Sequence, residues 1–256
     1  MRGRKKASVL FLLFLVGLLW LYGCGSPSPD SEVMADIEEE SDLDSGEELV
    51  YERSLELQYA ENFKVDYYEG GYTLLTITMD GTQFLIVPEN GDVPQTLDKE
   101  IVVLRRPIKD IYLVASSAMD IFSELDGLNS ITFSGQKEDG WFIEAAREEM
   151  QKGNILYAGK YSKPDYELLV SNHCALAIEN MMISHSPEVV ENLENFGIPV
   201  MIDYSSYESH PLGRVEWVKF YGALLGKEEE AERIFTDQAA ILERVSASER
   251  TDKTVA

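Results

Sequence analysis

Between residues 109 and 203 the chain alternates short apolar runs with segments whose apolar residues recur at helical spacing, and no other feature of the sequence limits the fold as strongly. Short apolar runs of this kind are typical of parallel strands that are buried on both faces. The runs lie at residues 111–114, 130–133, 155–156, 168–170 and 199–202, and the helical segments at residues 119–125, 141–151 and 187–196. Strands that alternate with helices indicate a parallel sheet covered by helices. The sequence therefore predicts a doubly wound α/β lobe.

A different pattern precedes this lobe. Residues 65–68, 72–78 and 83–87 form runs rich in β-branched and aromatic residues, and the last two are separated by Asp80-Gly81. Asp-Gly between two such runs is a strong hairpin signal. We predict a small antiparallel β meander over residues 63–87.

A long helical segment follows the lobe, at residues 215–247. Its apolar residues recur at spacings of three and four, and Gly226-Lys227 forms a joint within it. Residues 253–256 are then expected to begin a further strand.

The N-terminal residues have the profile of an export signal. Residues 1–6 are basic and residues 9–21 are almost entirely apolar. A transmembrane helix needs about 20 apolar residues, so we expect residues 1–23 to be a signal peptide that is cleaved. Residues 25–61 then pass from Gly, Ser and Pro into an acidic tract, which predicts a solvated linker over residues 24–61.

Charge and cysteine content exclude several functions. A net charge of -24 excludes nucleic acid as a partner, because phosphate binding depends on Lys and Arg. Cys174 is the only cysteine besides Cys24, and its apolar surroundings predict a buried thiol. The three histidines have no compact metal-binding spacing, so we expect no metal site and no cofactor.

Four motifs together resemble those of a known family. Residues 21–24, Leu-Tyr-Gly-Cys, resemble the lipobox of bacterial lipoproteins, with an ordinary secretory signal and a chance cysteine as the alternative. GKYSKPDYELLV at residues 159–170, FGIPV at 196–200 and YGALLGKEEEAE at 221–232 accompany it. In this order they resemble the class III substrate-binding lipoproteins of ABC importers, which bind iron-siderophores, haem or cobalamin. The likeness extends from about residue 106 to the last residue.

The resemblance implies a non-enzymatic monomer that captures a small molecule between two lobes and delivers it to an ABC permease. Cys24 would be lipidated and would hold the protein on the extracytoplasmic face of the cell membrane. Residues 62–214 would form the N-terminal lobe with its meander, residues 215–250 the interlobe helix, and residues 251–256 the start of a mostly missing second lobe. The meander and a long link at residues 172–187 depart from the family pattern.

We expect the ligand residues in the loops that follow each predicted strand, because ligands of open α/β sheets bind beyond the carboxyl ends of the strands. The candidates are Ser116, Ser117, Trp141, Lys160, Tyr161, Asn172, Tyr204, Tyr207, His210 and Arg214.

Each candidate has a functional and a structural interpretation. Ser116 and Ser117 either face a ligand oxygen or cap a helix. Trp141 either covers a flat ligand face or packs at a helix start. Lys160 and Tyr161 suit an anionic ferric complex, or they form a solvated turn.

Residues 203–214 form the densest polar and aromatic cluster. Arg214 would clamp a carboxylate or hydroxamate, while Tyr204, Tyr207 and His210 would contact a metal chelate. In the alternative interpretation this loop only starts a helix and Arg214 pairs with Glu216 or with a neighbour. From the resemblance alone, Glu167 is expected to contact the permease.

Two other functions remain open. The first is an extracellular α/β hydrolase, although the sequence contains no Gly-x-Ser-x-Gly elbow. A non-transport surface lipoprotein would use the acidic tract and the meander for partner contacts.

Overall fold

The computed structural model describes residues 49–246. The predicted signal peptide, Cys24, most of the predicted linker and residues 251–256 lie outside this range.

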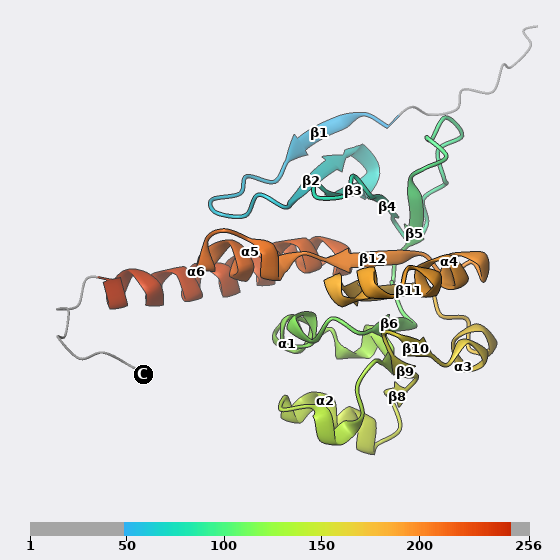
Figure 1. Ribbon diagram of the computed structural model, residues 1–256. Helices are drawn as coiled ribbons and strands as arrows, with labels where there is room; N and C mark the ends of the chain where they lie inside the picture. Colours follow the sequence, from blue (N-terminus) through green and yellow to red (C-terminus); the bar gives the residue numbers. More distant parts are fainter. Residues whose placement is uncertain (1–48, 247–256) are drawn as a thin grey trace, which may run out of the picture. The chain divides into compact units, whose positions relative to one another are not determined.

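The first sheet is a five-stranded extension of the predicted meander (Figure 1). Its order is β1-β2-β3-β4-β5, antiparallel except for the parallel pair β4–β5. The strands are β1 (Tyr51–Ser54), β2 (Phe63–Tyr68), β3 (Tyr72–Ile77), β4 (Gln83–Val87) and β5 (Val102–Arg105). Every second side chain of β2 and of β3 is buried. This pattern is expected for a sheet that packs against the core with one face only.

Strand β1 lies inside the segment that was predicted as linker, and this part of the prediction was wrong. All of its residues are exposed, so its sequence lacks the alternation of apolar and polar residues that predicts a strand. It is held by its antiparallel pairing with β2.

The second sheet is fully parallel and has the order β12-β11-β6-β7-β8. Its strands are β6 (Ile111–Leu113), β7 (Ile131–Ser134), β8 (Leu156–Tyr157), β11 (Leu176–Asn180) and β12 (Val200–Asp203). The chain moves outward from β6 to β8, then returns to the other side of β6 for β11 and β12. This reversal is the topological switch of a doubly wound sheet, and it confirms the predicted fold class.

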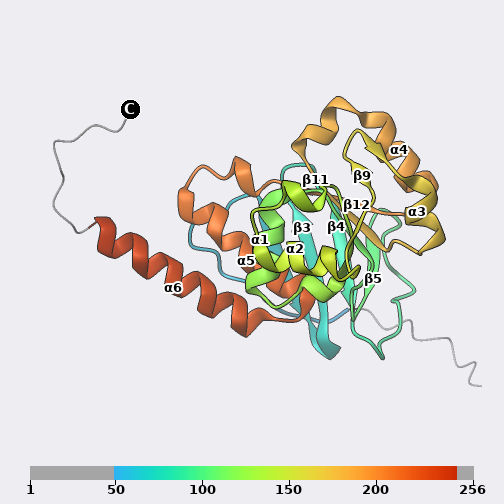
Figure 2. The ribbon, with the colours of Figure 1, turned by 90° about the horizontal axis from the view of Figure 1, so that it is seen from below.

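Helices cover both faces of the parallel sheet. They are α1 (Ser116–Glu124), α2 (Glu144–Gln151), α3 (Tyr166–Ser171) and α4 (Pro187–Asn195). Helices α1 and α2 share a core with Ile111 and Leu113 of β6, whereas α3 and α4 pack with Tyr112 and the adjacent Val114. Figure 2 shows α1 and α2 apart from α3 and α4. The alternation of side chains along β6 therefore separates the two cores.

The region between α2 and α4 corrects two predictions. Residues 168–170 were predicted as a strand, but they belong to α3, whose N-cap Asp165 accepts a hydrogen bond from Leu168 N at 3.0 Å. The predicted long link at residues 172–187 instead contains β11, which lies beside β6 at the switch. Three apolar residues fit a helix or a strand equally well, and the polar Glu179 and Asn180 weaken the apolar signal of β11.

Short elements complete the chain. They are the hairpin strands β9 (Gly159–Lys160) and β10 (Lys163–Pro164) and the 3-10 helices η1 (Glu69–Gly71), η2 (Leu128–Ser130), η3 (Glu138–Gly140), η4 (Met181–His185) and η5 (Ser205–Tyr207).

The predicted long helical segment is two helices, α5 (Pro211–Leu225) and α6 (Glu228–Ser246). The predicted joint is confirmed, because Gly226 ends α5 in the left-handed conformation with a φ of 72°. Helix α6 folds back along α5, so that Gly222 faces Ala231 and Lys219 Nζ lies 2.8 Å from Glu232 Oε2. A Cβ atom on Gly222 would lie only 2.4 Å from that of Ala231, which explains how closely the helices approach.

Helix α5 joins the two sheets. Figure 1 shows it between the meander sheet and α1. Trp217 and Phe220 contact Phe63 of β2, while Tyr221 contacts Phe122 of α1. Most residues of α5 are buried, as expected for a helix that is packed on several sides.

Two buried carboxylates of this region bind backbone amides that follow β1. Glu216 of α5 accepts hydrogen bonds from the amides of residues 58–60 at 2.8–3.1 Å. Glu208 accepts from the amides of Glu61 and Asn62 and from Trp217 Nε1. Glu216 is also paired with the buried Lys219 at 3.3 Å. We call Glu208, Glu216 and the amides of residues 58–62 the carboxylate latch.

Within residues 49–246, no helix is both long enough and apolar enough to cross a membrane.

Candidate ligand-binding site

The carboxyl ends of the parallel strands lie at one edge of the sheet, called the carboxyl edge below. Strand β6 leads directly into α1, whereas β11 leads into η4. Because β6 and β11 are neighbours whose connections leave in opposite directions, a crevice is expected between them. The loops after β7, β8 and β12 border the same edge.

A cluster of hydroxyl groups surrounds the buried Asp203 at the end of β12. Its Oδ1 accepts hydrogen bonds from Ser205 Oγ at 2.5 Å and from Ser117 Oγ at 3.4 Å. Its Oδ2 accepts from the buried Tyr221 OH at 2.5 Å. Burial, and then the charge of Asp203, raises the pKa of Tyr221 well above its usual value, so the phenol stays a donor.

Ser116 and Ser117 lie exposed at the start of α1. The N-cap position is Ala115, and no side chain caps the helix there. The amides of the first turn therefore face the carboxyl edge together with two hydroxyl groups. These serines were predicted either to face a ligand or to cap the helix, and the structure does not show them as caps.

The loop after β12 divides into buried and exposed residues. Tyr204 is buried, and burial followed by the charge of Asp80 raises its pKa to about 12. Tyr207 is 56% exposed, with its ring centroid 6.2 Å from that of Tyr204. His210 is the N-cap of α5: its Nδ1 accepts from Leu212 N at 3.1 Å. The helix-start interpretation therefore holds for His210.

Arg214 is exposed on the first turn of α5. The predicted pairing with Glu216 is not what the structure shows, because Glu216 is fully buried in the carboxylate latch. His210 also stacks on Tyr59, with ring centroids 4.5 Å apart.

Trp141 is a packing residue in this structure. It is 4% exposed, and its Nε1 donates a hydrogen bond to Ser134 Oγ at 3.0 Å. Its neighbour Phe142 is fully exposed, so it is the aromatic side chain that this loop presents to solvent. Phe142 was not among the predicted residues, because two adjacent aromatic residues in a sequence do not indicate which one faces the core.

Lys160 and Tyr161 belong to the β9–β10 hairpin. Lys160 is exposed, whereas Tyr161 is half-buried against the core beneath α3 and α4. Gly159 permits the tight turn with a φ of 85°, and its carbonyl accepts a hydrogen bond from Tyr112 OH at 2.9 Å. Glu167 is exposed in the first turn of α3.

Asn172 does not belong with the other candidates. It ends α3, where its Nδ2 donates to Leu168 O at 2.8 Å, and it precedes β11. It therefore lies toward the amino end of β11, opposite the carboxyl edge. Asn172 was a candidate because residues 168–170 were predicted to form a strand, whereas the structure has them in α3. The residues that follow β11 include Met182, which is 49% exposed.

Glu179 of β11 is an unexpected feature of the switch. It is fully buried, and neither carboxyl oxygen has a hydrogen-bond partner among the described residues. Burial raises its pKa to about 8, so the protonated form is favoured at neutral pH. Burial, and then the proximity of Glu179, raises the pKa of Tyr112 on the neighbouring β6.

The described residues contain no group of three or more side chains placed to hold a metal ion. The predicted burial of Cys174 is confirmed, and burial raises the pKa of its thiol to about 11.

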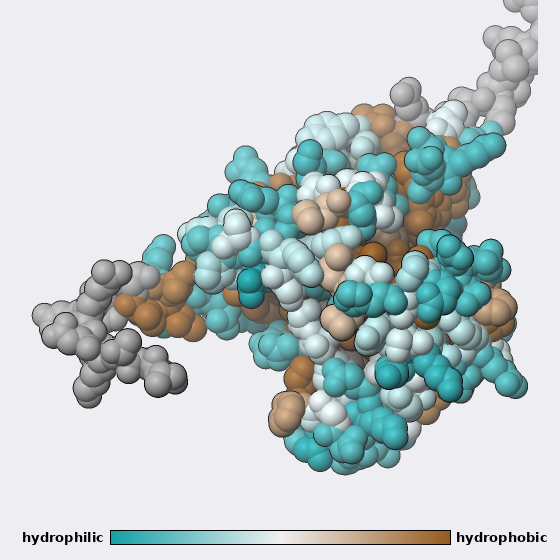
Figure 3. All heavy atoms as spheres, viewed as in Figure 1, coloured by the Kyte–Doolittle hydropathy of each residue, from teal (hydrophilic) through white to brown (hydrophobic). Residues whose placement is uncertain are grey.

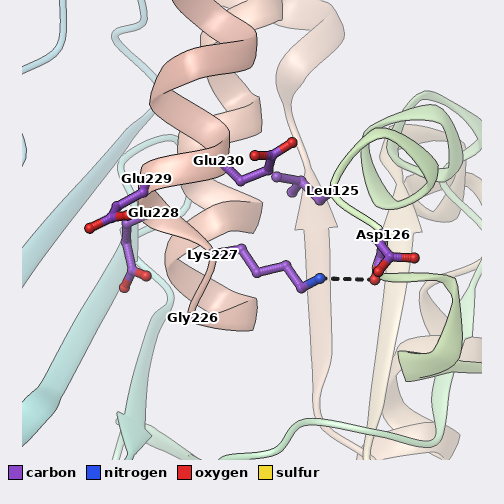
Figure 4. A pocket seen from close by; sticks show the side chains of 7 residues that line it. All are labelled: Leu125, Asp126, Gly226, Lys227, Glu228, Glu229 and Glu230. Carbon is purple, nitrogen blue, oxygen red and sulfur yellow. Dashed lines mark hydrogen bonds between the residues drawn. The ribbon is translucent and has the colours of Figure 1, made fainter.

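A pocket of about 660 Å³ lies at the α5–α6 turn, away from the carboxyl edge (Figure 4). Lys227 Nζ donates to the carbonyl of Asp126 across it at 2.9 Å. Its three glutamates, Glu228, Glu229 and Glu230, occupy the first turn of α6, where the helix dipole favours acidic residues without a ligand.

The fold and the carboxyl edge together define an α/β lobe of a type that binds ligands beyond its strands. No family model matches the chain. It is similar to two curated relatives from Methanocaldococcus jannaschii, Uncharacterized lipoprotein MJ0878 (23% identity, 70% of this chain and 48% of the relative) and Uncharacterized lipoprotein MJ0872 (28% identity, 74% and 49%). The chain thus spans about half the length of these relatives.

The solved structures to which this chain is similar include proteins named as binding proteins. They include a periplasmic heme binding protein from Pseudomonas aeruginosa, with a TM-score of 0.42 and 18% identity over 55% of this chain and 46% of that chain. HutB, a heme binding protein of Vibrio cholerae, has a TM-score of 0.44 and 15% identity over 56% and 51%. The siderophore binding protein BauB has a TM-score of 0.43 and 16% identity over 54% and 47%.

Proposed function

We propose that this chain forms the N-terminal lobe of an extracytoplasmic substrate-binding lipoprotein of an ABC importer. The observation that carries the proposal is the open carboxyl edge of a doubly wound sheet, with exposed side chains around its topological switch. The naming of both curated relatives as lipoproteins supports an anchor at Cys24.

The exposed groups at this edge suit an anionic ligand with a flat or apolar surface. Ser116, Ser117 and the free amides of α1 provide donors for anionic oxygens. Lys160 and Arg214 provide positive charge, and Tyr207, Phe142 and Met182 provide apolar contact area. Iron-siderophore complexes, haem and cobalamin have these properties in different proportions, and we propose one of these three classes as the ligand.

The same edge favours binding over hydrolysis. Ser117 is an exposed hydroxyl at this edge, and its hydrogen-bond partners are Asp203 and Ser205 rather than a histidine. Without a general base, a serine hydroxyl is a weak nucleophile. The role proposed for Ser117 is therefore to contact the ligand through its hydroxyl group and not to act as a nucleophile. Glu167 remains the proposed contact with the permease.

The test is thermal unfolding of the purified full chain with ferrichrome, a ferric catecholate siderophore, haemin and cyanocobalamin. A ligand at about 100 times its Kd adds roughly 2.7 kcal/mol to the free energy of unfolding. We expect one class to raise the Tm by several degrees, and the variants Ser117→Ala and Tyr207→Ala to reduce that rise.

Asn172→Ala is the matched control, because Asn172 lies at the opposite edge and should leave the ligand effect unchanged. Metal-free siderophores control for effects of the organic part. If none of the four ligands changes the Tm, or if the Asn172 variant loses binding as fully as the Ser117 variant, the proposed site is wrong.

A further inference from the structure

A second recess lies away from the carboxyl edge, between the two sheets. It has a volume of about 560 Å³ and is lined by Asp80, Thr82, Glu100, Val102, Val103, Val190, Glu194, Gly197, Pro199, Val200 and Ile202. We call it the edge groove. Figure 3 shows hydrophobic atoms recessed between the surface over β5 and that over α4, with hydrophilic residues around them.

The groove is bordered by an edge strand of each sheet. Among residues 49–246, strand β5 is paired only with β4, and β12 only with β11. An edge strand presents backbone N–H and C=O groups that another extended chain can pair with. Val103 of β5 is 37% exposed and Val102 is half-buried, so part of this edge is accessible.

The lining also has a one-sided charge. Its apolar residues are accompanied by the carboxylates of Asp80, Glu100 and Glu194, and no Lys or Arg is found among the described residues that line it. Arg105 of β5 does not pair with these carboxylates, because its guanidinium donates hydrogen bonds to the carbonyls of Pro88, Glu89 and Gly91. The groove therefore combines free strand edges, aliphatic side chains and uncompensated negative charge.

We propose that the edge groove binds an extended peptide segment of a partner protein, one that alternates β-branched and basic residues, by adding a strand to β5. Backbone pairing would supply part of the affinity, and the aliphatic lining and the carboxylates would select the side chains. A second copy of this chain is a poor occupant, because the net charge of -24 opposes self-association through an acidic groove.

The test is calorimetric titration of the full chain with the peptide acetyl-KVTVKVTVK-amide. Two comparison peptides replace every Lys by Glu or every Thr by Pro, since Pro cannot donate to a strand ladder. We expect binding of the first peptide only, accompanied by a change in the NMR shift of the Val103 amide. Binding of either comparison peptide with similar affinity, or no binding of the first, would overturn the proposal.

Charge reversal locates the site. Glu100→Lys combined with Glu194→Lys should weaken binding about tenfold or more, because both carboxylates line the groove. Glu191→Lys is the matched control, since Glu191 is exposed on α4 but does not line the groove. Circular dichroism verifies that all variants fold.

Equal weakening by the control, or equal binding of spermine, would show nonspecific or small-cation binding and refute a strand site. Concentration-dependent dimerisation of the chain, measured by sedimentation and abolished by the same double reversal, would also refute it by making a second copy the occupant.

Discussion

Glu179 lies at a position where a charged side chain would destabilise the fold. Its carboxyl group is fully buried on β11, without a hydrogen-bond partner among the described residues. An ionised carboxylate in such surroundings either finds a partner or takes up a proton. The raised pKa of about 8 indicates the second outcome.

The residue should make stability depend on pH. The folded pKa of about 8 exceeds the ordinary value of 4.5, so the folded state holds the proton more tightly than the unfolded state. The resulting stabilisation is fully present below pH 4.5 and is lost as the pH rises toward 8, by up to about 1.4 kcal/mol per pH unit. In urea unfolding between pH 5 and 8, Glu179→Gln should therefore show a smaller decrease in stability than the unmodified chain.

Glu188→Gln is the control for Glu179, because Glu188 is exposed on α4 and its substitution should leave the pH slope unchanged. Parallel pH profiles for the unmodified chain and Glu179→Gln would contradict the predicted buried proton.

Tyr221 should contribute to stability through its hydroxyl group. Tyr221→Phe would remove the donor to Asp203 Oδ2 while keeping the buried ring. Leaving a buried acceptor without this donor costs about 1–3 kcal/mol, which urea unfolding would measure. Tyr207→Phe should change stability by less than about 0.5 kcal/mol, because that side chain is mostly exposed. Equal effects of the two changes would argue against the Asp203 cluster.

Among the elements, α5 is held to the segment after β1 by the carboxylate latch. Glu216→Ala would free the amides of residues 58–60 and would leave the buried Lys219 with Glu232 as its remaining carboxylate. Removing one partner of a buried ion pair typically costs about 3–5 kcal/mol. We expect a loss of this size and faster hydrogen exchange at residues 58–60, measured by mass spectrometry.

Glu243→Ala is the matched change for Glu216, since Glu243 is exposed on α6. Exchange at residues 58–60 that stays slow in Glu216→Ala would show that other contacts hold this segment.

The α5–α6 hairpin depends on a close contact between two small residues. Gly222→Ala would place a methyl group 2.4 Å from the Cβ of Ala231 and force the helices apart. Overpacking of this kind costs about 1–3 kcal/mol. Ala231→Gly in the same chain should restore part of the loss, as a double-mutant cycle of thermal unfolding would show. Additive losses would mean that the two residues do not limit the approach.

At the scale of the whole molecule, the sequence predicted the elements whose apolar runs are unbroken. Strands β6, β7 and β12 and the meander hairpin belong to this class, as does the joint at Gly226. Strand β11 was missed because Glu179 interrupts its run, and α3 was mistaken for a strand because three apolar residues have no distinguishable period.

The candidate site was only partly predictable for a related reason. The positions of Ser116, Ser117 and Tyr207 follow from strand ends that were placed correctly, whereas Asn172 follows from one that was not. The latch residues Glu208 and Glu216 resemble many other acids in this chain, and only the fold reveals that they are buried. The amino-acid composition does not indicate which of many carboxylates accepts a hydrogen bond from a backbone amide.

The two sheets should unfold together. One core contains Phe63 and Phe84 of the meander, Leu113 of β6 and Trp217 of α5. Such a shared interior gives a single cooperative transition. We expect tryptophan fluorescence and far-UV circular dichroism to give the same midpoint in urea. Separate midpoints would show that the meander sheet is independently stable.

The shared helix also limits how this architecture can be shortened. A chain beginning after β5 would keep every strand of the fully parallel sheet, yet the face of α5 that contacts Phe63 would then meet water. Large exposed apolar faces promote aggregation. Deletion of the meander sheet would therefore produce an adhesive fragment rather than a smaller lobe, and in evolution the sheet could be lost only together with new polar residues on α5.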